Sequence, residues 1–167
     1  MVLMLCALVG IAAAAAPAVF RPAVRIVYNS SSSAPLGWYR VHSVTSLKVG
    51  DYVLATLPTA AAALAAQRDY LPVGVPIVKR VSAVASQHVC ARDDALMIDG
   101  RPSGRILRSD RQGHPLPVWQ QCRNLISGEL FLLSTTNPAS FDSRYFGPIR
   151  SFAVLGQAVP LWTWSAP

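Results

Sequence analysis

Residues 75–84, with the sequence VPIVKRVSAV, place apolar side chains around Lys79 and Arg80. Side chains of a β-strand alternate between the two faces of a sheet, so this pattern predicts a strand that holds Lys79 in an apolar setting. Comparable short patterns predict further strands at 25–28, 37–44, 51–57, 95–98, 130–134 and 152–164. Gly156 and Pro160 are expected to break the last of these strands.

One helix is predicted between these strands. Residues 59–70 are rich in alanine, Thr59 can cap the first turn, and Pro72 and Gly74 follow the last turn. Asp99-Gly100, directly after a predicted strand, is typical of a hairpin turn. The fold class expected from these elements is mainly β, an antiparallel β-sheet domain with one short helix.

The N-terminal segment is distinct from this domain. Residues 2–20 contain no charged side chain, which is close to the roughly 20 residues that a membrane-spanning helix needs. We expect residues 1–20 to be a retained membrane anchor and residues 21–167 an extracytoplasmic domain. A cleaved signal peptide and a buried core helix are the alternatives. Arg21 and Arg25 follow the span, which conflicts with this orientation under the positive-inside rule.

Composition limits the class of partner. Hydrophobic residues make up 52% of the chain and charged residues only 14%, which favours contact with lipid. The net charge of +7 suits anionic lipid headgroups or nucleic acid. The polar stretch 101–111 contains four arginines and no aromatic residue, so it is expected to be a solvated loop and not a groove for single-stranded nucleic acid.

Three tryptophans and three cysteines allow further expectations. Trp38, Trp162 and Trp164 suit either a lipid interface or the protein core. Cys6 lies in the apolar span, which leaves one pair of cysteines, at positions 90 and 122, in the rest of the chain. We expect this pair to form a disulfide in an oxidising compartment, worth roughly 3–4 kcal/mol. A metal site is the alternative, although no metal-binding motif is present, and no cofactor is expected.

A catalytic base can be sought among histidines and lysines. His42, His88 and His114 lie in no recognisable local motif. Of the 15 basic residues only Lys48 and Lys79 are lysines, and arginine stays protonated and cannot act as a base. Lys48 is in a polar turn, whereas burial of Lys79 would lower its pKa as a neutral amine base requires. A lysine in a strand is also often a surface residue whose amine reaches water, so this pattern alone leaves Lys79 a candidate.

Three separated segments resemble one family, in the same order along the chain. Residues 29–39, NSSSSAPLGWY, resemble the nucleophile box of the TraF-type peptidases of bacterial conjugation. Residues 78–81, VKRV, resemble the lysine box of signal peptidase I, and residues 140–147, SFDSRYFG, resemble the closing box of that family. Ala34 stands where typical signal peptidases have methionine, which favours the TraF-type branch.

The resemblance implies roles for single residues. Ser33 would be the nucleophile, chosen from four consecutive serines by its spacing from Pro35, and Lys79 would be its base. The main-chain N–H of Ser33 and the hydroxyl of Ser31 would form the oxyanion hole. Without the resemblance, a run of serines is most simply a polar loop.

The closing box would support this dyad. Ser140 would orient the lysine amine, and Asp142 with Arg144 would form a structural salt bridge beside the site. Considered alone, Asp142 and Arg144 would alternate on a strand and form a surface pair that contributes little stability.

The implied function is that of a serine endopeptidase at the inner membrane with its catalytic domain in the periplasm. Its substrate would be a pilin-like precursor cleaved after small residues, with hydrolysis or head-to-tail cyclisation as the outcome. A general signal peptidase has the same chemistry with a wider substrate range. A catalytically silent envelope scaffold of a secretion system is the alternative from another class.

Overall fold

The computed structural model describes residues 4, 6, 7, 9–11, 25–134 and 136–164. The expected anchor at residues 1–20 lies largely outside this set. No helix formed by the described residues has both the length and the apolar character needed to cross a bilayer.

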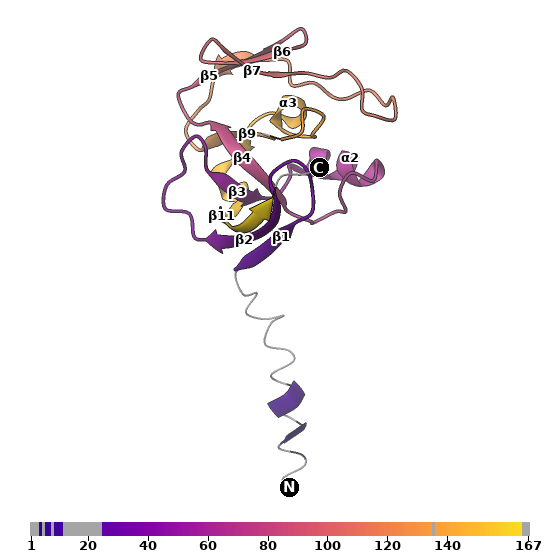
Figure 1. Ribbon diagram of the computed structural model, residues 1–167, viewed down its shortest axis with the longest axis vertical. Helices are drawn as coiled ribbons and strands as arrows, with labels where there is room; N and C mark the ends of the chain where they lie inside the picture. Colours follow the sequence, from indigo (N-terminus) through magenta and orange to yellow (C-terminus); the bar gives the residue numbers. More distant parts are fainter. Residues whose placement is uncertain (1–3, 5, 8, 12–24, 135, 165–167) are drawn as a thin grey trace.

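The main sheet is antiparallel throughout and, within the described residues, has seven strands. In order across the sheet they are β1 (Ile26–Asn29), β2 (Leu36–His42), β11 (Val154–Trp164), β3 (Tyr52–Ala55), β4 (Ile77–Ala83), β9 (Glu129–Leu133) and β10 (Ile149–Arg150). The expected mainly β, antiparallel fold class is confirmed. Because β11 pairs with both β2 and β3, the end of the chain completes the middle of the sheet (Figure 1).

A second, smaller sheet lies at the far side of the main one from β1 (Figure 1). The described residues give it four strands, in the order β7 (Arg101–Arg105), β6 (Ala95–Ile98), β5 (His88–Arg92) and β8 (Cys122–Asn124). Asp99 and Gly100, both with positive φ, form the expected turn between β6 and β7. The arginine-rich stretch therefore begins as an exposed strand and not as a loop.

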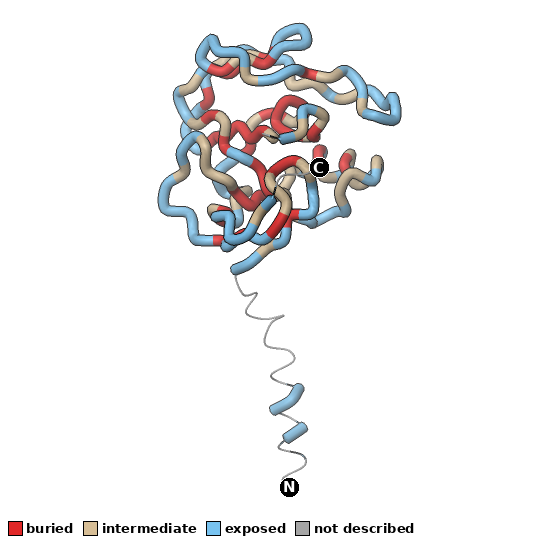
Figure 2. The backbone as a smooth tube through the Cα atoms, in the orientation of Figure 1, coloured by how far each residue is buried: buried red, intermediate tan, exposed pale blue. Residues whose placement is uncertain are grey.

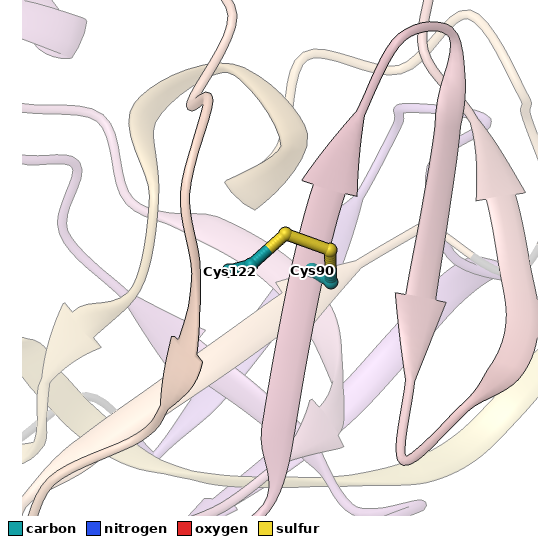
Figure 3. The surroundings of a disulfide bond; sticks show 2 residues. All are labelled: Cys90 and Cys122. Atoms are coloured by element: carbon teal, nitrogen blue, oxygen red, sulfur yellow. A yellow bond between two sulfur atoms is a disulfide. The ribbon is translucent and has the colours of Figure 1, made fainter.

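The expected disulfide is present in the small sheet. Cys90 of β5 and Cys122 of β8 are directly paired across the two strands, and their sulfurs are bonded (Figure 3). Cys6 is free and exposed. The disulfide thus ties β8 to β5, at the point where the long connection from β7 rejoins the small sheet.

Three clusters of buried side chains form the core, and buried positions follow the strands of both sheets (Figure 2). The strand predicted from the opening pattern contributes to all three clusters. Val78 packs with Tyr39 and Leu54, Val81 packs with Leu132, and Ala83 belongs to the cluster that contains Phe131. Alternation along β4 therefore lets one strand serve both faces of the main sheet.

The helix and the last strand differ from expectation in detail. Helix α2 (Thr59–Gln67) begins after Pro58, and no side chain caps it, so Thr59 is not its N-cap. It ends before Tyr70 because Asp69 adopts a left-handed conformation (φ 55°). Strand β11 is not broken at Gly156 and Pro160. Its pairing shifts register near both residues, which is how a sheet accommodates glycine and proline.

Two further short helices were not predicted: α3 (Ser143–Phe146) and the 3-10 helix η1 (Ser151–Ala153). Helix α3 follows β9 through a loop at residues 134–142, and η1 leads into β11. The loop and α3 contain the third family-like segment, so this region determines how the candidate site is closed.

The tryptophans of β2 and β11 are not core residues. Trp38 is 46% exposed, Trp162 73% and Trp164 43%, which shows that the core alternative was wrong. Tyr28 lies between two of them, with ring centroids 5.1 Å from Trp38 and 6.3 Å from Trp164. We call these four residues the aromatic edge. It lies on β1, β2 and β11, which are neighbours in the main sheet (Figure 1).

Candidate active site

The serine run forms a tight loop between β1 and β2, organised by a buried asparagine. The Nδ2 of Asn29 donates to the carbonyl oxygens of Ser31 (2.9 Å), Ala34 (3.1 Å) and Pro35 (3.0 Å). Its Oδ1 accepts from the N–H and the hydroxyl of Ser31, at 3.3 and 3.0 Å. The loop therefore wraps around one side chain, which fixes its conformation.

Ser33 lies at the inner side of this loop. It is 8% exposed, and its Oγ lies 2.7 Å from the Oγ of Ser31. Ala34, the next residue, is buried in the core, and the Tyr39 hydroxyl donates to the Pro35 carbonyl at 2.7 Å. Of the four serines, Ser33 is the buried one, whereas Ser30 and Ser31 are exposed.

Lys79 is held on β4 in a nearly dry environment. Its side chain is 3% exposed, and its Nζ donates to the Oγ of Ser140. Burial lowers the pKa of Lys79 from 10.5 to about 8, a shift that Asp142 opposes and Arg144 reinforces. Lys79 thus has the lowered basicity that a neutral amine base needs near neutral pH. Lys48, the other lysine, is exposed.

Asp142 and Arg144 form a buried ion pair beside the site, and not the surface pair on a strand that the two residues considered alone would suggest. The guanidinium contacts both carboxylate oxygens at 2.8 Å, and the side chains are 0% and 4% exposed. Asp142 is the N-cap of α3 and accepts the N–H of Arg144. Two residues at this spacing can face each other at the start of a helix as well as on a strand. Asp142 and Arg144 lie at the start of helix α3.

Arg144 also holds the loop that carries Ser140. Its guanidinium donates to the carbonyl oxygens of Pro138 (2.7 Å), Ser140 (3.1 Å) and Arg105 (2.8 Å). Asp142 in turn accepts the N–H of Ser134 at 3.0 Å. The buried pair therefore joins both ends of the 134–142 loop and sets the position of Ser140 beside Lys79.

A second connection joins the two loops that carry the serines. The Nδ2 of Asn137 donates to the Oγ of Ser32 at 2.9 Å, and the hydroxyl of Thr136 donates to the Ser32 carbonyl. Sequence reasoning assigned no role to Asn29, Ser32 or Asn137. Asn29 precedes the serine run and Asn137 precedes a proline, both typical of turns, but neither signal identifies a partner.

These groups meet at a cavity of about 380 Å³. Ser31, Ser33, Lys79 and Ser140 line its polar side. Apolar and aromatic side chains line the remainder, among them Leu57, Leu71, Leu116, Phe141 and Tyr145. Such a mixture, apolar walls with a few convergent polar groups, is typical of a substrate site.

The rim of the cavity is closed by contacts between the turn that follows α2 and the connection at 106–121. Tyr70 donates to the carboxylate of Asp110, and Arg68 donates to the Pro115 carbonyl at 2.9 Å. His114 pairs with Asp110 at 2.9 Å, so this histidine serves the rim. All three histidines are described and exposed, and none lines the cavity. The described residues contain no cluster of three or more potential metal ligands.

The arrangement suits acyl transfer by a serine. The buried hydroxyl of Ser33, the desolvated amine of Lys79 and the hydroxyl of Ser140 that accepts from it all line one cavity, and the Ser31 hydroxyl adjoins that of Ser33. Ser33, Lys79, Ser31 and Ser140 are brought together as the resemblance implied, with Asp142 and Arg144 directly behind them.

Comparisons with known proteins agree with this geometry. Residues 1–164 match the family model described as signal peptidase, peptidase S26. The chain is 32% identical to a plasmid transfer protein TraF of Escherichia coli, over 81% of this chain and 82% of that protein. It is 33% identical to a probable conjugal transfer protein TraF of Sinorhizobium fredii, over 82% of this chain and 77% of that protein.

A solved signal peptidase I from Enterococcus faecalis aligns with a TM-score of 0.43 and 21% identity, over 69% of this chain and 98% of that one. The family match covers nearly the whole chain, and the relatives cover most of its length at more than 30% identity. The chain belongs to the signal peptidase family, peptidase S26.

Proposed function

We propose that this protein is a serine endopeptidase in which Ser33 is the nucleophile and Lys79 the general base. The observation that carries the proposal is the burial of Lys79, which lowers its pKa to about 8 while Ser140 holds its amine at the cavity of Ser33. Such a desolvated lysine is costly in a structural role but is what a Ser-Lys dyad needs.

The reaction begins when the neutral Lys79 amine takes the hydroxyl proton of Ser33. At the same time the Oγ of Ser33 bonds to the carbonyl carbon of the scissile peptide. The N–H of Ser33 and the hydroxyl of Ser31 stabilise the oxyanion. The C–N bond then breaks as the Lys79 ammonium gives its proton to the leaving nitrogen, which leaves an ester on Ser33.

A water molecule or an amine completes the cycle by attacking this ester. Lys79 removes the proton of the attacking group, the bond to Oγ breaks, and Ser33 recovers a proton from Lys79. Water gives a hydrolysed product, whereas the N-terminal amine of the same substrate gives a cyclic one.

The proposed substrate is a pilin-like precursor, cleaved after small residues, in conjugative transfer. Supporting this substrate class, the relatives cited above are named plasmid or conjugal transfer proteins. A general signal peptidase is the second candidate, because the family as a whole carries that name. The two candidates share the dyad and differ only in substrate range.

The proposed location is the inner membrane, anchored by residues 1–20, with residues 21–167 in the periplasm. The charge-free run at 2–20 supports an anchor, and the Cys90–Cys122 disulfide suits an oxidising compartment. The exposed aromatic edge would face the lipid surface.

The test uses the full-length protein in membranes with two substrates, a conjugative pilin precursor and an ordinary secretory precursor. We expect cleavage of the pilin precursor, none by Ser33→Ala, and a product mass that distinguishes hydrolysis from cyclisation by one water. Equal cleavage of both precursors would favour the general signal peptidase. Cleavage of neither would support a catalytically silent scaffold.

A further inference from the structure

Asn29 is a buried polar residue at the start of the serine loop for which the proposed mechanism has no use. It is 6% exposed, and the hydrogen bonds of its side chain are all with the loop that carries Ser31 and Ser33. Its amide orientation is fixed by these contacts, because the opposite orientation would point Oδ1 at three carbonyl oxygens. Nδ2 is therefore the donor, and Oδ1 is the acceptor facing Ser31.

Counting hydrogens then sets the direction of the hydrogen bonds at the nucleophile. Ser31 has one hydroxyl hydrogen, and it is donated to Oδ1 of Asn29 at 3.0 Å. In the 2.7 Å contact between the two hydroxyl groups, Ser33 is therefore the donor and Ser31 the acceptor. The resting loop thus contains a directed chain from the Ser33 hydroxyl through the Ser31 hydroxyl to the Asn29 carboxamide.

We propose that Asn29 is a positioning residue for the reaction. It holds the Ser31 hydroxyl beside Ser33 and, during the reaction, frees the hydrogen of that hydroxyl to bind the developing oxyanion. The inference rests on the proposed function of Ser33. On attack, the Oγ of Ser33 loses its proton to Lys79, and the Ser31 hydroxyl turns its hydrogen from Asn29 to the substrate oxygen. Asn29 keeps the Ser31 N–H at Oδ1, so the loop keeps its shape while the hydroxyl rotates.

No other side chain of similar size can do this. The carboxylate of an aspartate would face the carbonyl oxygens of Ser31, Ala34 and Pro35 without a hydrogen to donate. The carboxamide of Asn29 shares two hydrogens among the three carbonyl oxygens, whereas a serine or threonine has only one. The position therefore requires both halves of a short carboxamide, one to hold the loop and one to hold Ser31.

The test is a double-mutant cycle on the full-length enzyme with Asn29→Ala, Ser31→Ala and the double variant, assayed with the pilin precursor. Each single variant should lose kcat on the order of 10²-fold with little change in KM, because the oxyanion donor is misplaced or missing. If Asn29 acts through Ser31, the double variant should be no more than about twofold slower than the slower single variant. Losses that multiply, or full activity of Asn29→Ala, would overturn the inference.

Controls separate this result from misfolding and from failure of the proposed function. Asn124→Ala, at an exposed position of β8, should retain normal activity. Thermal unfolding checks that Asn29→Ala is folded. If Asn29→Ala is unfolded, Asn29→Ser takes its place in the cycle, because serine keeps an oxygen that can accept the Ser31 N–H. Activity in Ser33→Ala would reject the peptidase mechanism itself. If Ser33→Ala is inactive but the losses of Asn29→Ala and Ser31→Ala multiply in the double variant, only the positioning role of Asn29 is rejected.

Discussion

Replacing Lys79 by arginine keeps the positive charge and removes the ability to act as a base. With a pKa of about 8, roughly one Lys79 amine in ten is neutral at pH 7. At the reference value of 10.5 the fraction would be roughly one in three thousand, so burial raises the supply of free base about 300-fold. Lys79→Arg should therefore abolish cleavage, a loss of at least about 10³-fold.

The pH dependence follows from the same numbers. Turnover by the wild-type protein should rise about tenfold per pH unit below pH 8 and level off above it, as the Lys79 amine becomes neutral. The assay is single-turnover cleavage of the pilin precursor across this range. Lys48→Arg is the matched control, because Lys48 is exposed and should be replaceable without loss.

Stability should respond to pH in a corresponding way. Between pH 8 and 10.5 the unfolded chain binds the Lys79 proton and the folded chain does not, so the free energy of unfolding rises with pH. The full difference is roughly 3 kcal/mol, present as a penalty below pH 8 and relieved towards pH 10.5. Lys79→Met should lack this slope in denaturant titrations compared with wild type.

Two results would refute this reasoning. A correctly folded Lys79→Arg protein that cleaves the precursor would reject the dyad, and the base would have to be sought among the histidines. A wild-type pH profile with no inflection near 8 would show that the protonation of Lys79 does not limit the reaction.

Further predictions concern the surroundings of the site. Arg144→Ala should lower the free energy of unfolding by about 3–5 kcal/mol, measured by denaturant titration, because it leaves a buried carboxylate unpaired; a loss below about 1 kcal/mol would contradict this. Thiol counting on unreduced, denatured protein should find one free thiol, that of Cys6, and three would exclude the Cys90–Cys122 bond in the native protein. Residues 21–167 should float with liposomes through the aromatic edge, and an entirely unbound fraction would argue against a lipid-facing role.

Local patterns predicted where most strands lie and left Lys79 as the candidate for a buried lysine. The apolar residues on both sides of Lys79 reflect its place between two core clusters, which is a local property of β4. The resemblance to the nucleophile box, through the spacing from Pro35, singled out Ser33, and the structure buries this serine while it exposes Ser30 and Ser31.

Contacts between distant segments could not be predicted in this way. Asp142 and Arg144 have the same spacing on a strand and at a helix start, and the choice depends on carbonyl groups such as that of Arg105, 39 residues before Arg144. The bond between Asn137 and Ser32 spans 105 residues and joins two loops that carry no joint pattern. These contacts arise from the packing of the sheet, which local periodicity does not specify.

The place of β11 makes the order of synthesis part of how the candidate site is assembled. The nucleophile loop lies between β1 and β2, Lys79 lies on β4, and β11 is the strand that joins β2 to β3. A ribosome delivers both residues of the proposed dyad long before it delivers residues 154–164. Until that last strand is inserted, the sheet has two separate parts, with Ser33 on one and Lys79 on the other. By this topology a nascent chain lacks the proposed Ser33–Lys79 dyad until β11 joins the two parts of the sheet.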